Sequence, residues 1–554
     1  MKNRNIKRML FLSCRLWAGI VAAITITACQ QNEWDDHYQP TTAAEGSVIA
    51  VMQADGHFSH FLEAVSETGM GDVLSGTQTY TVWAPTDEAM GSADFDAALL
   101  DNHISRFLYG KEDLVDTLSL RVKMLNGKYV TFSRYDGYRI GDANLSSTCL
   151  QGRNGVVYGL DAIIPYYSNL YEKIQEDDRF SQIAAYLKTF DEDEFDGKKS
   201  ISIGQNEYGQ TVYDSIFNYH SYWMKHHGHI YQEDSTYTML LPTNEAYAQG
   251  EAVVKPCYRT FGEMLTDNSN AGRSLVITRT YALDDILADS LQKVHTLQAM
   301  TGDLVFRRMF NPQTVQYDSL ISTSGAVIHH PQAMFAGAVL EQASNGYAFV
   351  SDAWTLPAAD TWNKTVRVEA ETAVHRQLYT TTPTTYDATT ADFIGQVSGG
   401  RYLEVENSST SARMQPQIIF DLPGTLATAY NIYAVFAPGQ ARDAVYQGDS
   451  TRVNFYLNYV HEDGTMHEDA VISADPETGR TFVTNGNEMT RFLVAKNFRF
   501  PYANINMSED EELETTTQET AVKIRIQTNV AANETTLMNK IMRIDCFILE
   551  PVIE

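Results

Sequence analysis

Two stretches of the chain share one pattern of apolar and polar positions: YTVWAPTDEAM at residues 80–90 and YTMLLPTNEAY at residues 237–247. Each begins with a β-prone apolar run, and the proline that follows ends a strand because it cannot donate a ladder hydrogen bond. Thr86 is a residue type that caps helices, and Asp87 and Glu88 put negative charge in a first turn, where the helix dipole favours it. The pattern therefore predicts a strand, a corner and a capped helix start in both places.

Further echoes indicate that a whole domain is repeated. NGVVYGLDA at residues 154–162 matches NGYAFVSDA at residues 345–353 in Asn, Gly, Asp and Ala, and it predicts a glycine turn feeding a buried closing strand. Upstream, Phe58 and Ser59 are echoed 122 residues later. The offset grows from 122 to 157 and then to 191 residues, so the second copy carries about 35 extra residues before its motif and about 34 after it.

These motifs resemble the fasciclin (FAS1) family: the two opening stretches are similar to its first conserved motif, and NGVVYGLDAIIP to its closing strand. The resemblance implies an α/β module, a β-wedge packed with helices, at residues 47–166 and, with two insertions, at residues 168–358. FAS1 domains mostly serve adhesion and surface assembly. The family often has a Tyr-His pair in mid-domain; the first copy offers Asn102 and His103 there, and the second copy has no His.

The remainder, residues 364–554, follows another pattern. Short alternating stretches separated by turns rich in Gly, Asn, Asp and Thr predict a β-sandwich. The predicted strands lie at residues 365–368, 402–405, 417–420, 430–436, 453–460, 522–527 and 542–549. VRVEAE, GGRYLEVENSS and MRIDCFILEP resemble the galactose-binding-like jelly rolls, which include many carbohydrate-binding modules. The expected fold is thus multidomain: two α/β FAS1-like domains followed by an all-β jelly-roll sandwich.

The N-terminus has the features of an export signal. Basic residues precede an apolar run at residues 16–28, which is too short for a transmembrane helix of ~20 residues. The run ends in ITAC and resembles the lipobox of bacterial lipoproteins, which implies a signal peptide at residues 1–28 and a lipid on Cys29. An ordinary secretory signal with a chance cysteine is the alternative. Residues 29–46 resemble the acidic tethers that direct some lipoproteins to the outer face of the outer membrane.

Charge and cysteine content narrow the functional classes. The net charge is -29 and no block rich in Lys and Arg is present, which argues against nucleic acid as a partner because a phosphate backbone needs a basic face. Beyond the signal and Cys29 only Cys149, Cys257 and Cys546 remain. They allow one disulfide but no disulfide framework, and their spacing is not that of a structural zinc site.

The insertion before the second motif is rich in aromatic and histidine residues, IFNYHSYWMKHHGHIYQ at residues 216–232. Three interpretations stay open: a Zn or Cu site, since neutral imidazoles suit these ions; a surface that stacks on sugars or anchors a protein; and aromatics that pack the insertion onto its own domain. The candidate binding residues are Tyr219, Tyr222, Trp223, His226, His227 and His229.

The predicted sandwich offers two further candidate sites. In sugar-binding jelly rolls, acids at the start and end of the domain often share a structural Ca²⁺, and Glu369, Glu371 and Asp545 match that placement by resemblance. Exposed strand acids are the alternative. Tyr402 and Tyr446 are candidates for a sugar-binding surface.

No nucleophile elbow, P-loop or HExxH motif is present, and we expect no enzymatic activity and no certain cofactor. The combined resemblances imply a lipid-anchored outer-membrane protein on the extracellular side. Its role would be to bind or dock as an accessory of a SusC/SusD-type transporter or with other surface lipoproteins, with a glycan or a peptide as ligand. The alternatives are an adhesin for host or matrix ligands and a glycan hydrolase with an unrecognised carboxylate pair.

Overall fold

The computed structural model describes residues 46–552, apart from gaps at 116, 196–197, 199–200, 206–210, 215–216, 262–264, 267–279, 282–284, 381, 407–412, 447, 449 and 506–521. The predicted signal peptide and Cys29, the predicted site of lipidation, lie outside the described residues. The chain divides into two compact units, the first ending at Tyr167 and the second beginning at Ser168. In the part of the chain that is described, no helix has the length and apolar character to cross a membrane.

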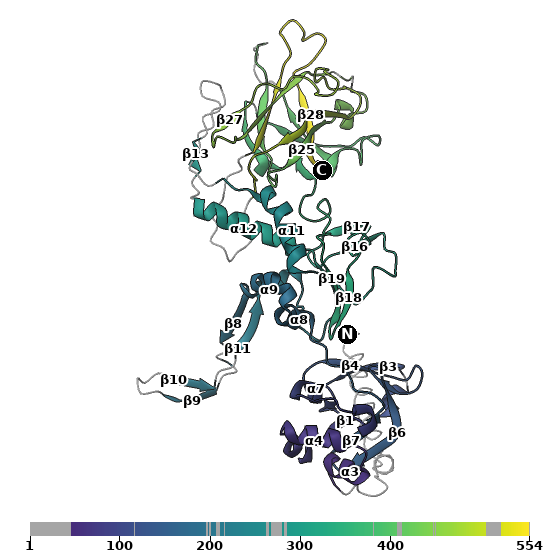
Figure 1. Ribbon diagram of the computed structural model, residues 1–554. Coiled ribbons are helices and arrows are strands. Elements are labelled where there is room, and N and C mark those ends of the chain that lie inside the picture. Colours follow the sequence, from purple (N-terminus) through teal and green to yellow (C-terminus); the bar gives the residue numbers. More distant parts are fainter. Residues whose placement is uncertain are drawn as a thin grey trace, which may run out of the picture. The chain divides into compact units, whose positions relative to one another are not determined.

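The first unit is an α/β domain built on one seven-stranded sheet in the order β2-β1-β7-β6-β5-β4-β3 (Figure 1). Its strands are β1 (Tyr80–Pro85), β2 (Ile104–Ser105), β3 (Ser119–Lys123), β4 (Tyr129–Ser133), β5 (Arg139–Ile140), β6 (Ala143–Gly152) and β7 (Gly155–Leu160). Its helices are α3 (Val48–Asp55), α4 (Ser59–Glu67), α5 (Gly71–Ser75), α6 (Asp87–Met90) and α7 (Ala97–Asp101), with a 3-10 turn at Lys111–Leu114.

The repeated motif folds as its pattern predicts. Strand β1 ends at Pro85, and the Thr86 side chain accepts a hydrogen bond from the Ala89 amide as the N-cap of α6. The NG stretch forms the turn into β7, which pairs in parallel with β1 from Tyr80 opposite Gly155 onward. A Cβ on Gly155 would lie 1.9 Å from the Tyr80 carbonyl oxygen, so only glycine allows this close approach.

The second unit repeats this central pair. Strand β12 (Tyr237–Pro242) runs parallel to β19 (Gly346–Ser351) in a four-stranded sheet of order β15-β12-β19-β18, with β15 (Val305–Arg307) and β18 (Val339–Ala343). The helices are α8 (Leu170–Glu176), α9 (Ser181–Lys188), α10 (Tyr222–His227), α11 (Asn244–Val254) and α12 (Asp285–Thr301), with 3-10 turns at Asp178–Phe180 and Lys255–Tyr258.

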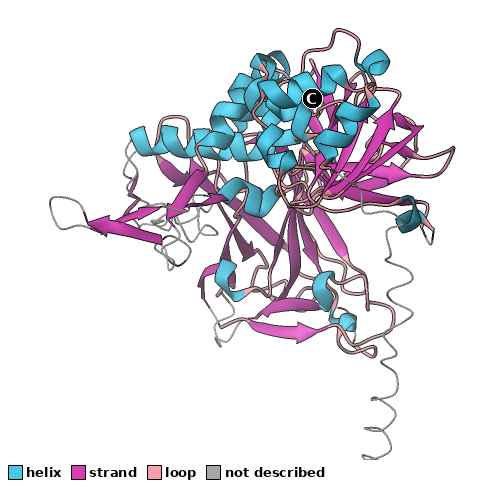
Figure 2. Ribbon diagram, turned by 90° about the horizontal axis from the view of Figure 1, so that it is seen from below, coloured by secondary structure: helices cyan, strands magenta, loops and turns pink. Residues whose placement is uncertain are grey.

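The second copy also contains small two-stranded ribbons. The ribbon strands are β8 (Asp191–Phe195), β9 (Ile201–Gln205), β10 (Thr211–Asp214), β11 (Phe217–Ser221), β13 (Leu265–Thr266), β14 (Thr280–Tyr281), β16 (Ser319–Ile321) and β17 (Val327–His329). The ribbon of β9 and β10 projects from the rest of its unit in both views (Figures 1 and 2).

An equivalent buried asparagine joins the first helix to the rest of the domain in both copies. Asn154 accepts a hydrogen bond from the amide of Val48 at the start of α3, at 2.8 Å, and donates to the Leu74 carbonyl, at 2.8 Å. Asn345 accepts from the amide of Leu170 at the start of α8, at 3.0 Å, and donates to the Ile230 carbonyl, at 2.7 Å. In each copy one side chain therefore fixes the first helix against the closing turn.

The C-terminal part of the second unit is the β-rich region that the alternating pattern predicts, and all seven predicted strands are present. Its strands are β20 (Val366–Glu369), β21 (Arg376–Tyr379), β22 (Thr384–Asp387), β23 (Arg401–Val405), β24 (Gln417–Asp421), β25 (Ala429–Phe436), β26 (Val453–Val460), β27 (Met466–Glu468), β28 (Thr490–Arg499), β29 (Lys523–Thr528) and β30 (Met542–Pro551). They form two antiparallel sheets, one of order β22-β23-β30-β25-β28 with β20 also on β30, the other of order β21-β24-β29-β26-β27. Apolar residues of both sheets share one core. We call residues 366–551 the β-domain.

Backbone hydrogen bonds join the second copy to the β-domain within this unit. The Ala427 amide donates to the Cys257 carbonyl at 2.8 Å, and the Ala503 amide donates to the Arg259 carbonyl at 2.7 Å. The Arg259 guanidinium also forms an ion pair with Glu462 at 2.8 Å. Cys149, Cys257 and Cys546 are free thiols, so the disulfide that the sequence allowed does not form.

Candidate functional site

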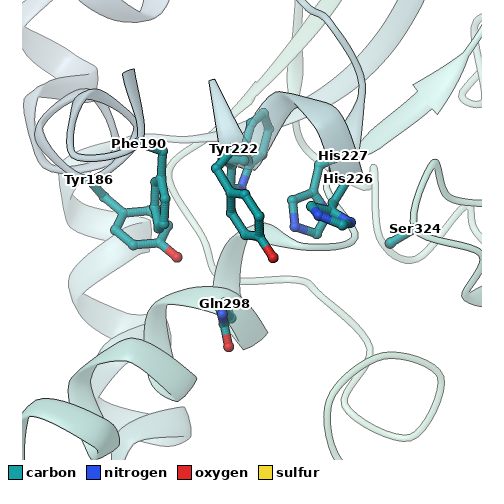
Figure 3. A pocket seen from close by; sticks show the side chains of 8 residues that line it. Tyr186, Phe190, Tyr222, His226, His227, Gln298 and Ser324 are labelled. Atoms are coloured by element: carbon teal, nitrogen blue, oxygen red, sulfur yellow. The ribbon is translucent and has the colours of Figure 1, made fainter. Parts of the chain in front are cut away.

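The aromatic and histidine residues of the insertion border a pocket of about 350 Å³ in the second copy (Figure 3). The pocket is lined by Tyr186, Phe190, Tyr222, Trp223, His226, His227, Gln298 and Ser324. Four of these eight side chains, all on α10, are among the candidate binding residues predicted from the sequence. The others lie up to about 100 residues from α10 along the chain, and no local sequence signal could have linked them to the insertion.

Helix α10 supplies side chains both to the core and to the pocket wall. Trp223 is only 2% exposed, and its indole N–H donates to the Thr301 hydroxyl at 3.1 Å, so its ring is fixed against α12. Residues four apart lie on one helix face, and the rings of Tyr222 and His226 accordingly lie 4.7 Å apart. Trp223 and His227 form the equivalent pair, at 5.0 Å.

The remaining wall comes from the segment that ends α9. The Tyr186 and Phe190 rings meet edge to face at 5.0 Å, and Phe190 stacks beside Tyr222 at 6.4 Å. In Figure 3 the hydroxyl groups of Tyr186 and Tyr222 point toward the side of the pocket where Gln298 lies. The site therefore combines ring faces with a few polar groups, the composition that suits a small ligand with one apolar face.

The metal interpretation of the insertion gains no support. Within the described residues, three candidate metal ligands come together at two places, and neither place includes His226, His227 or His229. The rings of His226 and His227 are 6.4 Å apart, and His229 faces Tyr231 instead.

Tyr219 belongs to a separate cluster that packs the insertion onto its own domain. Its hydroxyl donates to Asp191 at 2.7 Å, and its ring meets Tyr231 edge to face at 5.1 Å. Tyr171 hydrogen-bonds to the same Asp191 carboxylate. Burial and these hydrogen bonds raise the pKa of the Tyr219 hydroxyl, which therefore stays protonated. The insertion is thus partly packing and partly pocket wall.

Two of the three predicted calcium ligands, Glu369 and Asp545, come together in the β-domain, and the third possible ligand of that group is the Cys546 thiol instead of Glu371. Strand β20 pairs with β30 so that Glu369 lies opposite Cys546, next to Asp545. The Ser398 amide donates to Asp545 at 3.0 Å, and the Ser398 hydroxyl donates to Glu369 at 2.5 Å. Glu371 is not in that group, and its oxygen Oε2 is buried without a hydrogen-bond partner.

Burial and neighbouring negative charge disfavour the ionised form of the carboxyls in this region. Burial raises the pKa of Asp545 to about 7 against the hydrogen bond from Ser398, and the charges of Glu369 and Glu371 add to the rise. Burial also raises the pKa of Glu371. Oε2 of Glu369, like that of Glu371, is buried without a partner. Carboxylate oxygens in excess of their hydrogen-bond donors are a ligand set that suits Ca²⁺.

The two predicted sugar-binding tyrosines are not surface platforms. Tyr402 is 1% exposed and packs in a small cluster with Phe393 and Ala441, so its prediction as an exposed binding residue is wrong. Tyr446 is half-buried, lies directly over Gly439, and accepts a hydrogen bond from Arg543 at 3.1 Å. Its ring face is therefore used within the domain.

His103 has a structural place. It is fully buried, and burial lowers its pKa to about 4, so the ring is neutral. One ring nitrogen pairs with the Leu99 carbonyl at 2.9 Å, and the other accepts from the Ile164 amide at 2.9 Å. Both nitrogens are thereby used inside the domain.

The acidic position of the repeated motif is also structural. Asp87 accepts a hydrogen bond from the amide of His60, the second residue of α4, at 2.9 Å. Asn244 accepts from the amide of Gln182, the second residue of α9, at 3.0 Å. An amide oxygen replaces a carboxylate in this role, which explains why the two copies differ here.

Comparison with known proteins identifies the class of the first domain. Residues 56–165 match the family model of the fasciclin domain. This part of the chain is therefore a fasciclin domain, as the repeated motifs predict. A curated relative, the transforming growth factor-beta-induced protein ig-h3 of Oryctolagus cuniculus, is 28% identical over 140 residues, which covers 22% of this chain. The chain spans only about 20% of that relative's length.

Solved structures similar to this chain include the FAS1 domain pair of the insect cell adhesion molecule Fasciclin I, at 12% identity and a TM-score of 0.21. That match covers 55% of this chain and 99% of the other. The C-terminal family 22 carbohydrate-binding module of Clostridium thermocellum Xyn10B matches at 16% identity and a TM-score of 0.19, covering 34% of this chain and 95% of the module. Scores this low do not establish a common fold.

Proposed function

We propose that this protein is a non-enzymatic, lipid-anchored surface protein that binds and docks, as an accessory of a SusC/SusD-type nutrient-uptake complex. The observation that carries the binding role is the aromatic pocket of the second copy, which inserted residues build onto a repeated core. The lipobox-like segment ending at Cys29 and the acidic residues after it support the surface location. A lipid anchor would confine the chain to the membrane plane and raise its effective concentration near a partner.

The pocket suits one ring of a glycan or one side chain of a peptide. Its volume of about 350 Å³ is at the lower end of small-molecule sites, roughly 300–1,000 Å³. Tyr222 and Phe190 would stack on an apolar face, and Gln298 and Ser324 would hydrogen-bond to polar substituents. No bond is made or broken in this role.

Ligand binding is tested by titrating the full-length chain with panels of glycans and peptides in a calorimeter. Tyr222→Ala should abolish binding of any ligand found, because it removes a pocket wall. Tyr135→Ala is the matched control, since Tyr135 is 64% exposed on the fasciclin domain. Equal affinity of the Tyr222→Ala protein would remove the pocket from the proposal.

The uptake role is tested by affinity purification of the tagged chain from detergent-solubilised outer membranes. Co-purification of a transporter supports the proposal. Its repeated absence, with host or matrix proteins captured instead, favours the adhesin. Turnover of any glycan in the panel would contradict the non-enzymatic role, and membrane retention of a Cys29→Ala protein would contradict the lipid anchor.

We also propose that Glu369, Glu371 and Asp545 bind a structural Ca²⁺. The ion would supply positive charge to three clustered carboxylates and so hold the first and last strands of the β-domain together. The two buried carboxylate oxygens without partners support this assignment.

A further inference from the structure

A second group of possible metal ligands lies on the hairpin of β26 and β27. Tyr459 on β26 is opposite His467 on β27. Since alternate residues of a strand share a face, His461 lies on the face of Tyr459, and Asp469, which follows β27, lies on the face of His467. The hairpin register therefore brings two imidazoles and one carboxylate together, with their ligand atoms all within 4.8 Å of one another.

One ring nitrogen of His461 lacks a hydrogen-bond partner. Nε2 of His461 is buried and has no hydrogen-bond partner. The nearest carboxylate oxygen, Oδ1 of Asp469, is 3.4 Å away, which is long for a hydrogen bond. Two ligands at about 2.0–2.1 Å in a tetrahedral zinc site lie roughly 3.4 Å apart, so this separation suits a shared ion.

The third ligand and the support of the site are also present. The ring of His467 stacks on that of His461 at 3.5 Å, and His467 is exposed; to share an ion with His461, the His467 ring would leave this stack and turn its lone pair toward the shared point. The Tyr459 hydroxyl donates to Oδ2 of Asp469 at 2.9 Å, which leaves Oδ1 directed at His461. Hydrogen bonds of this kind orient the carboxylate ligands of metal sites.

We propose that His461, His467 and Asp469 bind one divalent transition-metal ion, with zinc as the best match to two imidazoles and a carboxylate. Solvent fills the fourth position beside the exposed His467. This site is separate from the aromatic pocket and from the acidic cluster, and it rests on neither of the functions proposed above.

The ion would stabilise the junction between the β-domain and the second fasciclin-like copy. Glu462, next to His461, forms the ion pair with Arg259 of that copy. Val460 and Met466 of the hairpin pack with Phe261 and Tyr502. Cross-linking the two strands here would hold these contacts in place.

The test is calorimetric titration of Zn²⁺ into the full-length chain, after removal of bound metals with a chelator and in excess Ca²⁺, which fills the acidic cluster. We expect a zinc site that His467→Ala weakens at least about tenfold and His461→Ala abolishes. Cobalt in place of zinc should give the visible absorption of a four-coordinate ion, and His467→Ala should remove it. Zinc should raise the melting temperature of the wild type and leave that of His467→Ala unchanged.

Two control proteins test whether zinc binding depends on His461 and His467 and not on other histidines. His329→Ala removes an exposed histidine that pairs with Asp360 at 2.9 Å, and it should bind zinc as the wild type does. A His226→Ala/His227→Ala protein removes the other histidine cluster and should also keep the site. The proposal is overturned if the wild type binds no zinc, or if His467→Ala binds it with unchanged affinity. Loss of the cobalt spectrum only in the His226/His227 variant overturns it as well.

Discussion

Replacing Asp545 with Asn should have opposite effects on stability in the presence and absence of calcium. Asp545 is 1% exposed, and the negative charges of Glu369 and Glu371 act on its carboxyl. Asn has nearly the same shape, carries no charge, and keeps one oxygen to accept the hydrogen bond from the Ser398 amide. The substitution therefore removes the charge and leaves the packing in place.

The magnitude follows from the pKa of Asp545. Its pKa rises from 3.8 to about 7, roughly three units at about 1.4 kcal/mol each, so ionising Asp545 costs the metal-free fold about 4 kcal/mol. Because the folded state holds this proton more tightly than the unfolded chain, metal-free stability falls as the pH rises from about 4 to 7. Allowing for the cost of burying an amide, Asp545→Asn should stabilise the metal-free protein by about 2–3 kcal/mol at pH 8. The difference should fall toward zero at pH 5.

Calcium should reverse the order. An ion at 1,000 times its dissociation constant stabilises the wild type by about 4.1 kcal/mol, which exceeds the advantage of about 2–3 kcal/mol that the metal-free variant holds, and a variant without this ligand gains little of that. Hydrogen-exchange mass spectrometry of peptides from β30 measures the free energy of opening at this site in the full-length chain.

Asp387→Asn is the matched control, because Asp387 lies on the same sheet with its side chain 77% exposed. It should change the opening free energy by less than about 0.5 kcal/mol under all conditions. The reasoning fails if metal-free Asp545→Asn is less stable than the wild type at pH 8, or if their difference does not depend on pH.

Three further predictions concern the repeated core. Burial lowers the pKa of His103 to about 4, so between pH 6.5 and 4 only the unfolded chain takes up a proton at this residue. The free energy of unfolding of the fasciclin domain, measured with urea, should therefore fall by about 3 kcal/mol over this pH range. The His103→Asn protein should show a smaller change with pH. Asp87→Asn should change stability by less than about 0.5 kcal/mol, since Asn244 serves the same role, whereas Asp87→Ala should cost about 1–2 kcal/mol in the same assay. Asn345→Ala should cost about 3 kcal/mol in denaturant unfolding of the second unit, because it leaves a buried amide and two carbonyls without partners.

The repeated core could be predicted because its signals are local. The strand before Pro85, the cap at Thr86 and the NG turn each need only neighbouring residues, and the second copy repeats them. Seven strands of the β-domain could likewise be predicted from their alternating pattern of apolar and polar residues. Strand β28 was not predicted, although its polar and apolar positions partly alternate, and its pairing with β25 depends on residues far away in the chain.

The sites depended on long-range pairing and were predicted less well. The alternation of apolar and polar residues shows on which face of its strand Tyr402 lies. Whether that face is buried depends on Phe393 and Ala441, which pack against Tyr402 from distant parts of the chain. No local sequence signal links His461 and His467, because five residues separate them and only the hairpin register places them on one face. The acidic cluster was found because a family resemblance supplied the distant partner of Glu369.

The pairing of β20 with β30 makes the first and last strands of the β-domain neighbours. Val366 lies opposite Leu549, so the first and last strands of the domain are adjacent in one sheet. Chain ends this close permit circular permutation: a short linker could join them, and new termini could open in the exposed turn at residues 475–479 without breaking either sheet. For the same reason, a fluorescent protein fused directly after β30 would emerge beside the segment that leads in from the second copy, and a fusion for imaging is better placed in that turn.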